Sequence, residues 1–136
     1  IQGIPALAFS HLNYLESTNL KPFSIIIKDL CLEVLENKLP EGITLNINFP
    51  DIDFHMVKGL KICKQGRGKW TEKFKLVNSK NLESYYSISG EFKSEKTDIT
   101  SDSWALANNF ISIVPVGLNP TKSNSLDKLK YLENAF

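Results

Sequence analysis

The order of the hydrophobic patterns along the chain predicts an α/β fold. Residues 4–9 form a short apolar run, residues 23–35 repeat apolar side chains at spacings of three and four, and residues 43–49 alternate between apolar and polar side chains. These patterns are typical of a buried strand, an amphipathic helix and a half-buried strand. A strand, a helix and a second strand in this order indicate a βαβ unit.

The first strand, at residues 4–9, is expected to be covered on both faces, as strands of parallel sheets are. Pro22 is expected in the first turn of the helix, where proline is favoured. The sequence LPEG at 39–42 ends the helix, and Pro50 ends the next strand. The helix buries an apolar stripe made of Phe23, Ile26, Ile27, Leu30, Val34 and Leu35.

The middle of the chain favours extended structure. Segments at 59–63, 74–77 and 85–92 read as strands of an extended hairpin or meander. They are separated by Gly66-Arg67-Gly68, interpreted as a turn, and by the polar residues 78–84.

The last third of the chain returns to alternating helix and strand. Residues 93–102 are polar and predict a surface loop, and residues 104–107 predict a helical turn. Residues 110–116 predict another buried strand. The helical turn has Ser101 or Asp102 as its N-cap. A short terminal helix is marked by Leu126, Leu129 and Leu132, with Ser123 or Ser125 as its cap.

Length, charge and cysteine content limit the classes of protein to which this chain can belong. A chain of 136 residues, 42% of them hydrophobic, suits one domain with a sizeable core. A net charge of +1 argues against a dedicated nucleic-acid or membrane-surface protein. No apolar run approaches the roughly 20 residues of a membrane-spanning helix. The two cysteines, Cys31 and Cys63, favour reduced thiols and a cytoplasmic location.

The beginning of the chain suggests that more sequence precedes it. The first residue is Ile1, and the single methionine is Met56. We therefore expect a processed chain or part of a longer polypeptide, with functional residues upstream.

Asp51, Asp53 and His55 place three potential metal ligands two residues apart. Side chains two apart in an extended segment share one side, so a metal site is one interpretation. The favoured alternative is a polar surface connection with Phe54 and Met56 turned inward, because no fourth ligand with suitable spacing is evident.

A basic cluster contains Lys58, Lys61, Lys64, Arg67, Lys69 and the neighbouring Trp70. Cations beside a stacking ring are typical of a groove for phosphate or single-stranded nucleic acid. Lysines on edge strands also prevent edge-to-edge pairing, and this solvated-edge interpretation is favoured.

The remaining candidates are weaker. The Gly66-Arg67-Gly68 segment lacks a third glycine and does not precede a helix. Ser10 and His11 follow the first strand, where α/β sheets place ligands, but a nucleophilic pair needs an orienting acid and an oxyanion hole. The two cysteines lie in a helix and a strand. No catalytic, cofactor-binding or metal-binding residue is therefore assigned within this chain.

Five segments together resemble one known family. They are GIPALAFS at 3–10, LPEGITLNINFP at 39–50, KGLKI at 58–62 with the following Gln65-Gly66, YYSISG at 85–90, and DSWAL at 102–106 with FISIVPV at 110–116. They are similar in order and spacing to segments in the C-terminal half of the SurE family, the stationary-phase survival proteins with 5′/3′-nucleotidase activity.

The resemblance implies the C-terminal part of a SurE-like, Rossmann-type three-layer α/β fold with a protruding β-hairpin. It implies one domain at 1–136, with core segments 1–57 and 100–118, a hairpin protrusion at about 58–92, and a tail helix at 119–136.

The resemblance also implies a function. SurE-like proteins are phosphatases dependent on a divalent metal (Mg²⁺ or Mn²⁺) that hydrolyse nucleoside monophosphates and, in some cases, polyphosphate. Their metal ligands would precede Ile1, so this segment alone is expected to bind no metal and to be inactive. The hairpin and tail would build a homo-oligomer, a dimer or tetramer, with no membrane partner. The alternative is a non-catalytic assembly module or a nucleic-acid-binding module, the latter being disfavoured.

Two departures from the family pattern have structural consequences. Asn109-Phe110 replaces Gly-Tyr, and asparagine tolerates the positive φ that such a turn needs. Residues 119–123 read NPTKS where the family has Asp-Leu-Thr-x-His. The missing histidine and the proline there suggest a changed anchoring of the C-terminal segment.

Overall fold

The computed structural model describes residues 4–13, 19–80, 83–94, 97–117, 119–121 and 123–134. Its strands are β1 (Leu7–His11), β2 (Ile43–Phe49), β3 (Leu60–Ile62), β4 (Gly68–Lys80), β5 (Glu83–Ser94) and β6 (Ile111–Gly117). Its helices are α1 (Ser24–Asn37), α2 (Asp102–Ala107) and α3 (Ser123–Leu129), with 3-10 turns η1 (Lys21–Phe23), η2 (Phe54–Met56) and η3 (Lys130–Asn134).

Four strands form the central mixed sheet, in the order β1-β2-β6-β3. Strands β1 and β2 are parallel and are joined through α1, so the predicted βαβ unit is confirmed. Strand β6 runs antiparallel to β2 and parallel to β3. The α/β fold class is therefore confirmed.

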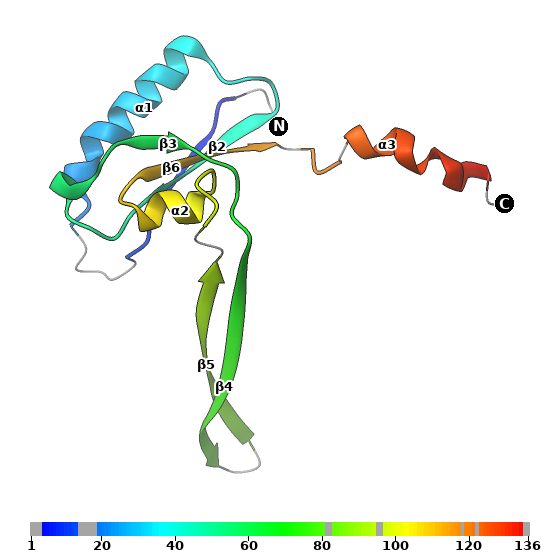
Figure 1. Cartoon of the computed structure of the whole chain (residues 1–136). Helices are drawn as coiled ribbons and strands as arrows, with labels where there is room; N and C mark the ends of the chain where they lie inside the picture. Colours follow the sequence, from blue (N-terminus) through cyan, green and yellow to red (C-terminus); the bar gives the residue numbers. More distant parts are fainter. Residues whose placement is uncertain are drawn as a thin grey trace.

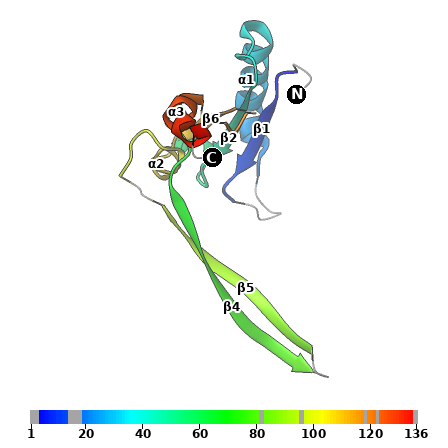
Figure 2. The same cartoon turned by 90° about the vertical axis from the view of Figure 1, so that its right-hand side faces the viewer.

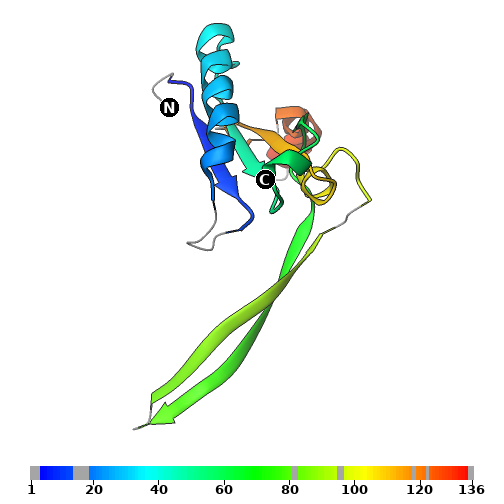
Figure 3. The same cartoon turned by 90° about the vertical axis from the view of Figure 1, so that its left-hand side faces the viewer.

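Helices cover both faces of this sheet. Phe23, at the end of η1 and just before α1, shares a buried cluster with Ile47 and Ile113, and Figure 3 shows α1 lying over β1 and β2. Val114 packs instead against Ala105 of α2. Because consecutive strand residues point to opposite faces, α1 and α2 form separate layers with the sheet between them.

Three expectations about burial were wrong. Ala8 and Ser10 of β1 are exposed, because β1 is an edge strand with one face covered by α1. Leu35 is 70% exposed although it was placed on the buried stripe, because Val34 takes the buried position in the last turns of α1. Met56 is 60% exposed at the end of η2, whereas Phe54 packs inward as predicted.

The hairpin of β4 and β5 projects from the core as a separate two-stranded sheet (Figures 1 and 2). Its extent differs from the predicted 58–92, because β3 belongs to the central sheet and β5 continues to Ser94. Gly66-Arg67-Gly68 is not a turn: residues 65–67 lead outward and Gly68 pairs with Ser94. The polar residues 78–84, expected to separate two strands, are largely strand themselves, and residues 81–82 lie outside the described part of the chain.

The two faces of this hairpin differ sharply in chemistry. One face, here called the apolar hairpin face, carries Trp70, Phe74, Leu76, Tyr86, Ile88 and Phe92, together with one charged residue, Glu72, opposite Gly90. The opposite face, the polar hairpin face, carries Lys69, Thr71, Lys73, Lys75, Ser87, Ser89, Glu91 and Lys93. Alternation along paired strands separates the two sets, up to a register shift between Leu76 and Asn78.

The segment after β5, which returns the chain from the hairpin to the core, confirms two local predictions. The side chain of Ser101 accepts a hydrogen bond from the Trp104 backbone nitrogen and caps α2. Asn109 has a φ of 70°, the positive value expected where asparagine replaces glycine. The loop predicted at 93–102 is not wholly exposed, since Ser101 is buried.

The terminal helix extends sideways from the body in Figure 1. It begins at Ser123 and continues into η3, confirming a helix in this region. Ser123 and Ser125 both lie inside α3, so neither precedes the helix as a cap would. Residue 122, which does precede it, lies outside the described residues.

Candidate functional site

The carboxyl ends of β1 and β2 border a cavity. The two strands are parallel, so His11 at the end of β1 and Asp51 just after β2 reach the same edge of the sheet. The cavity has a volume of about 420 Å³ and is lined by His11, Asn19, Pro22, Phe23, Asp51, Ile52, Asp53 and Phe54. This edge is where open α/β sheets bind ligands.

Asn13 connects the two polar groups at this edge. Its side-chain Nδ2 donates to Asp51 Oδ1 at 3.1 Å. His11 Nδ1 lies 3.0 Å from both the backbone nitrogen and the carbonyl oxygen of Asn13, so it accepts or donates according to its tautomer. The His11 ring also meets the Phe23 ring edge-on, at 5.4 Å between centroids. The imidazole and the carboxylate are therefore held in place beside the cavity.

The predicted ligand and nucleophile sets do not assemble at this edge. Asp51 and Asp53 line the cavity, but His55 does not. Across the described residues, no three His, Cys, Asp or Glu side chains are grouped closely enough to hold a metal ion. Ser10 and His11 are consecutive strand residues and point to opposite faces, which disfavours a nucleophilic pair. Among the described residues, the cavity presents one imidazole and two carboxylates to a polar ligand, but no assembled nucleophilic pair or metal-ligand group.

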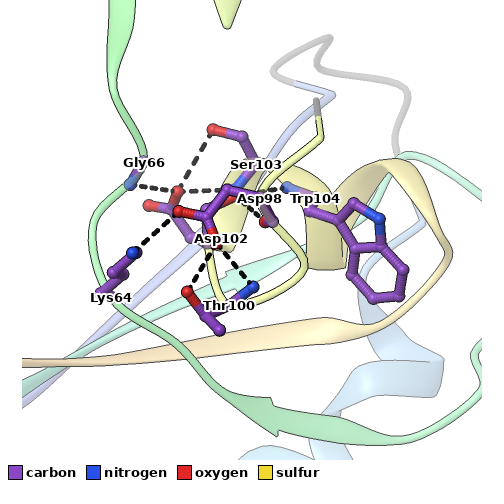
Figure 4. Close-up of polar contacts among 8 residues, drawn as sticks. Lys64, Gly66, Asp98, Thr100, Asp102, Ser103 and Trp104 are labelled. Atoms are coloured by element: carbon purple, nitrogen blue, oxygen red, sulfur yellow. Dashed lines mark hydrogen bonds and ion pairs between the residues drawn. The ribbon is translucent and has the colours of Figure 1, made fainter. Parts of the chain in front are cut away.

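A second polar cluster fixes the base of the hairpin to the core (Figure 4). Lys64 Nζ lies 2.8 Å from Asp98 Oδ2. The other oxygen, Asp98 Oδ1, accepts hydrogen bonds from the Thr100 nitrogen at 3.0 Å and hydroxyl at 2.6 Å. The hydrogen bond from Lys64, followed by those from Thr100, lowers the pKa of Asp98 from 3.8 to about 2.

Asp102 holds the outgoing arm of the hairpin in the same cluster. Its Oδ1 accepts from the backbone nitrogens of Gly66 at 2.8 Å and Ser103 at 2.6 Å. A Cβ atom at Gly66 would lie 2.6 Å from Ser103 Oγ, so the close approach requires glycine. The sequence indicated Ser101 and Asp102 as possible caps, but it did not reveal that Asp98, Thr100 and Asp102 anchor the hairpin.

Two adjoining cavities flank this base and share Arg67. One, of about 460 Å³, is lined by Lys64, Gln65, Arg67, Asp98 and Ser101. The other, of about 360 Å³, is lined by Arg67, Gly68, Lys69, Lys93 and Ser94. Lys93 was not among the candidates from sequence, because its partner across the hairpin is 24 residues away in the chain.

The basic cluster predicted from sequence is divided among different surroundings. Lys61 Nζ lies 5.1 Å from the centre of the Trp104 ring, and Lys58 Nζ lies 5.9 Å from the centre of the Phe110 ring. Lys64 is paired with Asp98. Lys69 and Trp70 point to opposite hairpin faces, so the cations and the ring do not line one groove.

The two cysteines are unpaired and lie in different surroundings. Cys63 is buried behind α2, and Cys31 is half-buried on α1. Burial raises the pKa of the Cys63 thiol, which makes it a poor nucleophile at neutral pH.

Comparisons with known proteins identify related sequences. The model of the family described as "Survival protein SurE" matches residues 1–72. A protein named 5′-nucleotidase SurE from Flavobacterium psychrophilum is 39% identical over 129 residues, or 95% of this chain and 50% of the relative. The protein of the same name from Flavobacterium johnsoniae is 36% identical, again over 95% of this chain and 50% of the relative.

A solved structure extends the likeness to three dimensions. The crystal structure of the SurE protein from Aquifex aeolicus matches with a TM-score of 0.75 and 28% sequence identity. The match covers 96% of this chain and 52% of that one. The chain thus spans about half the length of the relatives it matches.

Proposed function

Since this chain belongs to the survival protein SurE family, we propose that it forms part of a metal-dependent 5′/3′-nucleotidase that hydrolyses nucleoside monophosphates. The observation that carries the proposal is the match of nearly the whole chain to proteins named 5′-nucleotidase SurE. A match over half of each relative leaves room for reactive groups outside these 136 residues.

The described residues do not fit a metal centre of their own, because no three potential ligand side chains come together. The Mg²⁺ or Mn²⁺ of the proposed reaction would therefore be held by residues outside the described ones. What this chain offers is the cavity between the ends of β1 and β2. We assign it to the substrate side of the site, where His11 and Asp51 would contact the nucleotide away from its reacting phosphate.

Hydrolysis assays test this proposal directly. A polypeptide spanning the whole length of the relatives should release phosphate from nucleoside 5′-monophosphates with Mg²⁺ or Mn²⁺, and should lose activity in EDTA. The 136-residue chain alone should release none. Absence of nucleotidase activity in the long polypeptide would refute the assignment, and metal-dependent turnover by the short chain would refute the placement of the reactive groups.

A second role is favoured by the exposed apolar hairpin face: assembly into a homo-oligomer, a dimer or a tetramer. Its six large side chains, from Trp70 to Phe92, are each between 51% and 68% exposed. An isolated two-stranded hairpin is at best marginally stable in water. Covering such a face with a second copy of the chain would remove these side chains from water.

The free energy gained by burial is comparable with the cost of association, so two such faces can pair. Burying the exposed half of a large apolar side chain contributes roughly 1 kcal/mol, so two faces contribute roughly 12 kcal/mol. Association costs roughly 4–15 kcal/mol in lost freedom. The terminal segment of α3 and η3, which extends from the body with Leu126, Leu129 and Leu132 each about half exposed, would add to the interface.

The proposal also places the protein in the cytoplasm. The two unpaired cysteines support this location. No helix in the described part of the chain has the length and hydrophobicity needed to cross a membrane.

A further inference from the structure

Two lysines lie directly opposite one another at the base of the hairpin. Lys69 of β4 is in register with Lys93 of β5 on the polar hairpin face. Cβ atoms of such opposed residues are about 4.5–5.5 Å apart. Arg67, immediately before β4, lines the same cavity of about 360 Å³, to which Ser94 also contributes. Three cationic side chains thus border one small space.

These three cations have no ion-pair partner among the described residues, and Asp98, which lines the neighbouring cavity with Arg67, is paired with Lys64. Ion pairs within 4.0 Å, in the described part of the chain, are Lys64–Asp98 and Lys130–Asp127, and neither involves them. Glu91 lies on the same face, one pair further along, opposite Thr71. Glu95 and Lys96 lie outside the described residues and carry opposite charges. The hairpin base is therefore positively charged in a chain whose net charge is only +1.

The opposed lysines are not explained by the fold. Like charges directly opposite one another destabilise an antiparallel pair. Charged side chains do protect sheet edges, but a lysine opposite a glutamate would protect them equally well without repulsion. An anion held between Lys69 and Lys93 would offset this repulsion.

The packing beneath these cations holds the backbone that carries them. On the other face, the Phe92 ring lies over Gly68 and the Trp70 ring lies over Gly90, in both cases so closely that a Cβ atom would clash. The two rings contact each other, with centroids 6.4 Å apart. Because both strands are closely packed here, the backbone that carries the three cations does not have to be ordered when a ligand binds, which lowers the entropic cost of binding.

We propose that Arg67, Lys69 and Lys93 bind the phosphate group of a small anion at the base of the hairpin. A guanidinium can hold two phosphate oxygens at once, and the two ammonium groups add point charges. The aromatic rings are on the opposite hairpin face, so no ring is available to stack on a base. The site therefore recognises the phosphate itself, whether inorganic or carried by a nucleoside monophosphate. It does not depend on the proposed hydrolytic activity.

Thermal unfolding of the 136-residue chain tests this site, at constant ionic strength because exposed charges are screened by salt. Tm should rise by roughly 2–5 °C when inorganic phosphate replaces chloride at about ten times its dissociation constant. Adenosine 5′-monophosphate should give at least as large a rise, because the cavity at β1 and β2 is also proposed to contact a nucleotide, and the part of the rise lost in Lys93→Gln is the part due to this site. No rise with either would overturn the proposal, and a rise with the nucleotide alone would overturn recognition of phosphate by itself.

The variant Lys93→Gln distinguishes an effect on phosphate binding from an effect on the stability of the fold. Without phosphate, its Tm should equal or exceed that of the unmodified chain, because the repulsion from Lys69 is removed. With phosphate, its affinity should fall about three- to tenfold. Arg67→Lys should also weaken binding, since it keeps the charge but loses the two-point contact.

Lys75→Gln is the matched control: Lys75 lies on the same face, opposite Ser87, and does not line the cavity. Its response to phosphate should match that of the unmodified chain. In a phosphate titration followed by NMR, the amide signals of Gly68 and Ser94 should shift most. An equal phosphate response in Lys75→Gln and Lys93→Gln, or a lower Tm of Lys93→Gln without phosphate, would overturn the proposal.

Discussion

Lys64 and Asp98 join the two arms of the hairpin where they leave the core, with Lys64 Nζ 2.8 Å from Asp98 Oδ2. Two backbone hydrogen bonds run beside this ion pair: Lys64 donates to the Thr100 carbonyl, and Asp102 donates to the Lys64 carbonyl, each at 3.0 Å. The outgoing and returning arms are thus held side by side. The direction in which the hairpin leaves the body is set here, and any surface on the hairpin is positioned by it.

The Asp98 carboxyl should titrate well below its ordinary range, with a pKa of about 2. A pKa lowered by folding means that the contribution of Asp98 to stability is present above about pH 4 and is lost as the pH falls through 2. The side-chain carboxyl carbon of Asp98, followed by NMR, gives this value directly. In Lys64→Met the pKa should move back towards 3.8, and an unchanged pKa in that variant would contradict the assigned cause.

Gly90→Ala should destabilise the hairpin, because a Cβ atom there would meet the Trp70 ring and come within 2.7 Å of the Thr71 carbonyl oxygen. Crowding of this kind costs roughly 1–3 kcal/mol. Gly117→Ala, at the end of β6, is the control, since its nearest heavy atom would be 4.0 Å away. Urea unfolding should show a lower midpoint for Gly90→Ala only. Equal midpoints would indicate that the Trp70 ring moves aside freely.

Periodicity predicted the central strand and helix well, because each of them buries one face and the repeat of apolar residues along the sequence marks that face. The alternation of apolar and polar residues at 43–49 predicted β2, and the spacing of apolar residues from Phe23 onward predicted α1. The extent of the hairpin was missed because β4 and β5 have no core beneath them. Their polar residues, such as Asn78 and Ser84, look like loop in sequence but pair across the hairpin.

The candidate sites were only partly predictable. His11, Asp51 and Asp53 were recognised individually, but their meeting at one cavity depends on the parallel pairing of β1 and β2. Lys93 belongs with Lys69 only through the hairpin register, which is set by long-range pairing. Asp98 carried no local signal, because its partner Lys64 is on the other arm.

Ser101→Ala should destabilise α2 and the hairpin base together. Ser101 Oγ accepts from the Trp104 nitrogen at 3.1 Å and donates to the Asp98 carbonyl at 2.8 Å, in a buried position. Loss of such a cap costs about 1 kcal/mol, and somewhat more when a second bond is lost. Ser103→Ala is the control, because its hydroxyl makes one weaker bond, to Asp102 at 3.2 Å. The free energy of unfolding from urea titration measures both, and equal losses would contradict the capping role.

His11→Gln and Asp51→Asn should affect substrate binding more than turnover in a polypeptide spanning the relatives' length. Both residues line the cavity at the strand ends, but neither belongs to a group of metal ligands among the described residues. Loss of one polar contact should raise KM about three- to tenfold with kcat nearly unchanged. Asp29→Asn, on exposed α1, is the control. A fall in kcat with constant KM would place these residues in the chemical step instead.

Ile88→Lys should dissociate the proposed oligomer, because Ile88 lies opposite Phe74 in the middle of the apolar hairpin face. A lysine placed between two largely apolar faces is unfavourable even with Glu72 as a diagonal neighbour, so the dissociation constant should rise by roughly tenfold or more. Light scattering at micromolar concentrations would then report one chain for the variant and a multiple for the unmodified protein. Thr71→Lys makes the same charge change on the polar hairpin face, opposite Glu91, and should leave the mass unchanged. If the unmodified chain is itself monomeric, or if Thr71→Lys dissociates it equally, the apolar face is not the contact between copies.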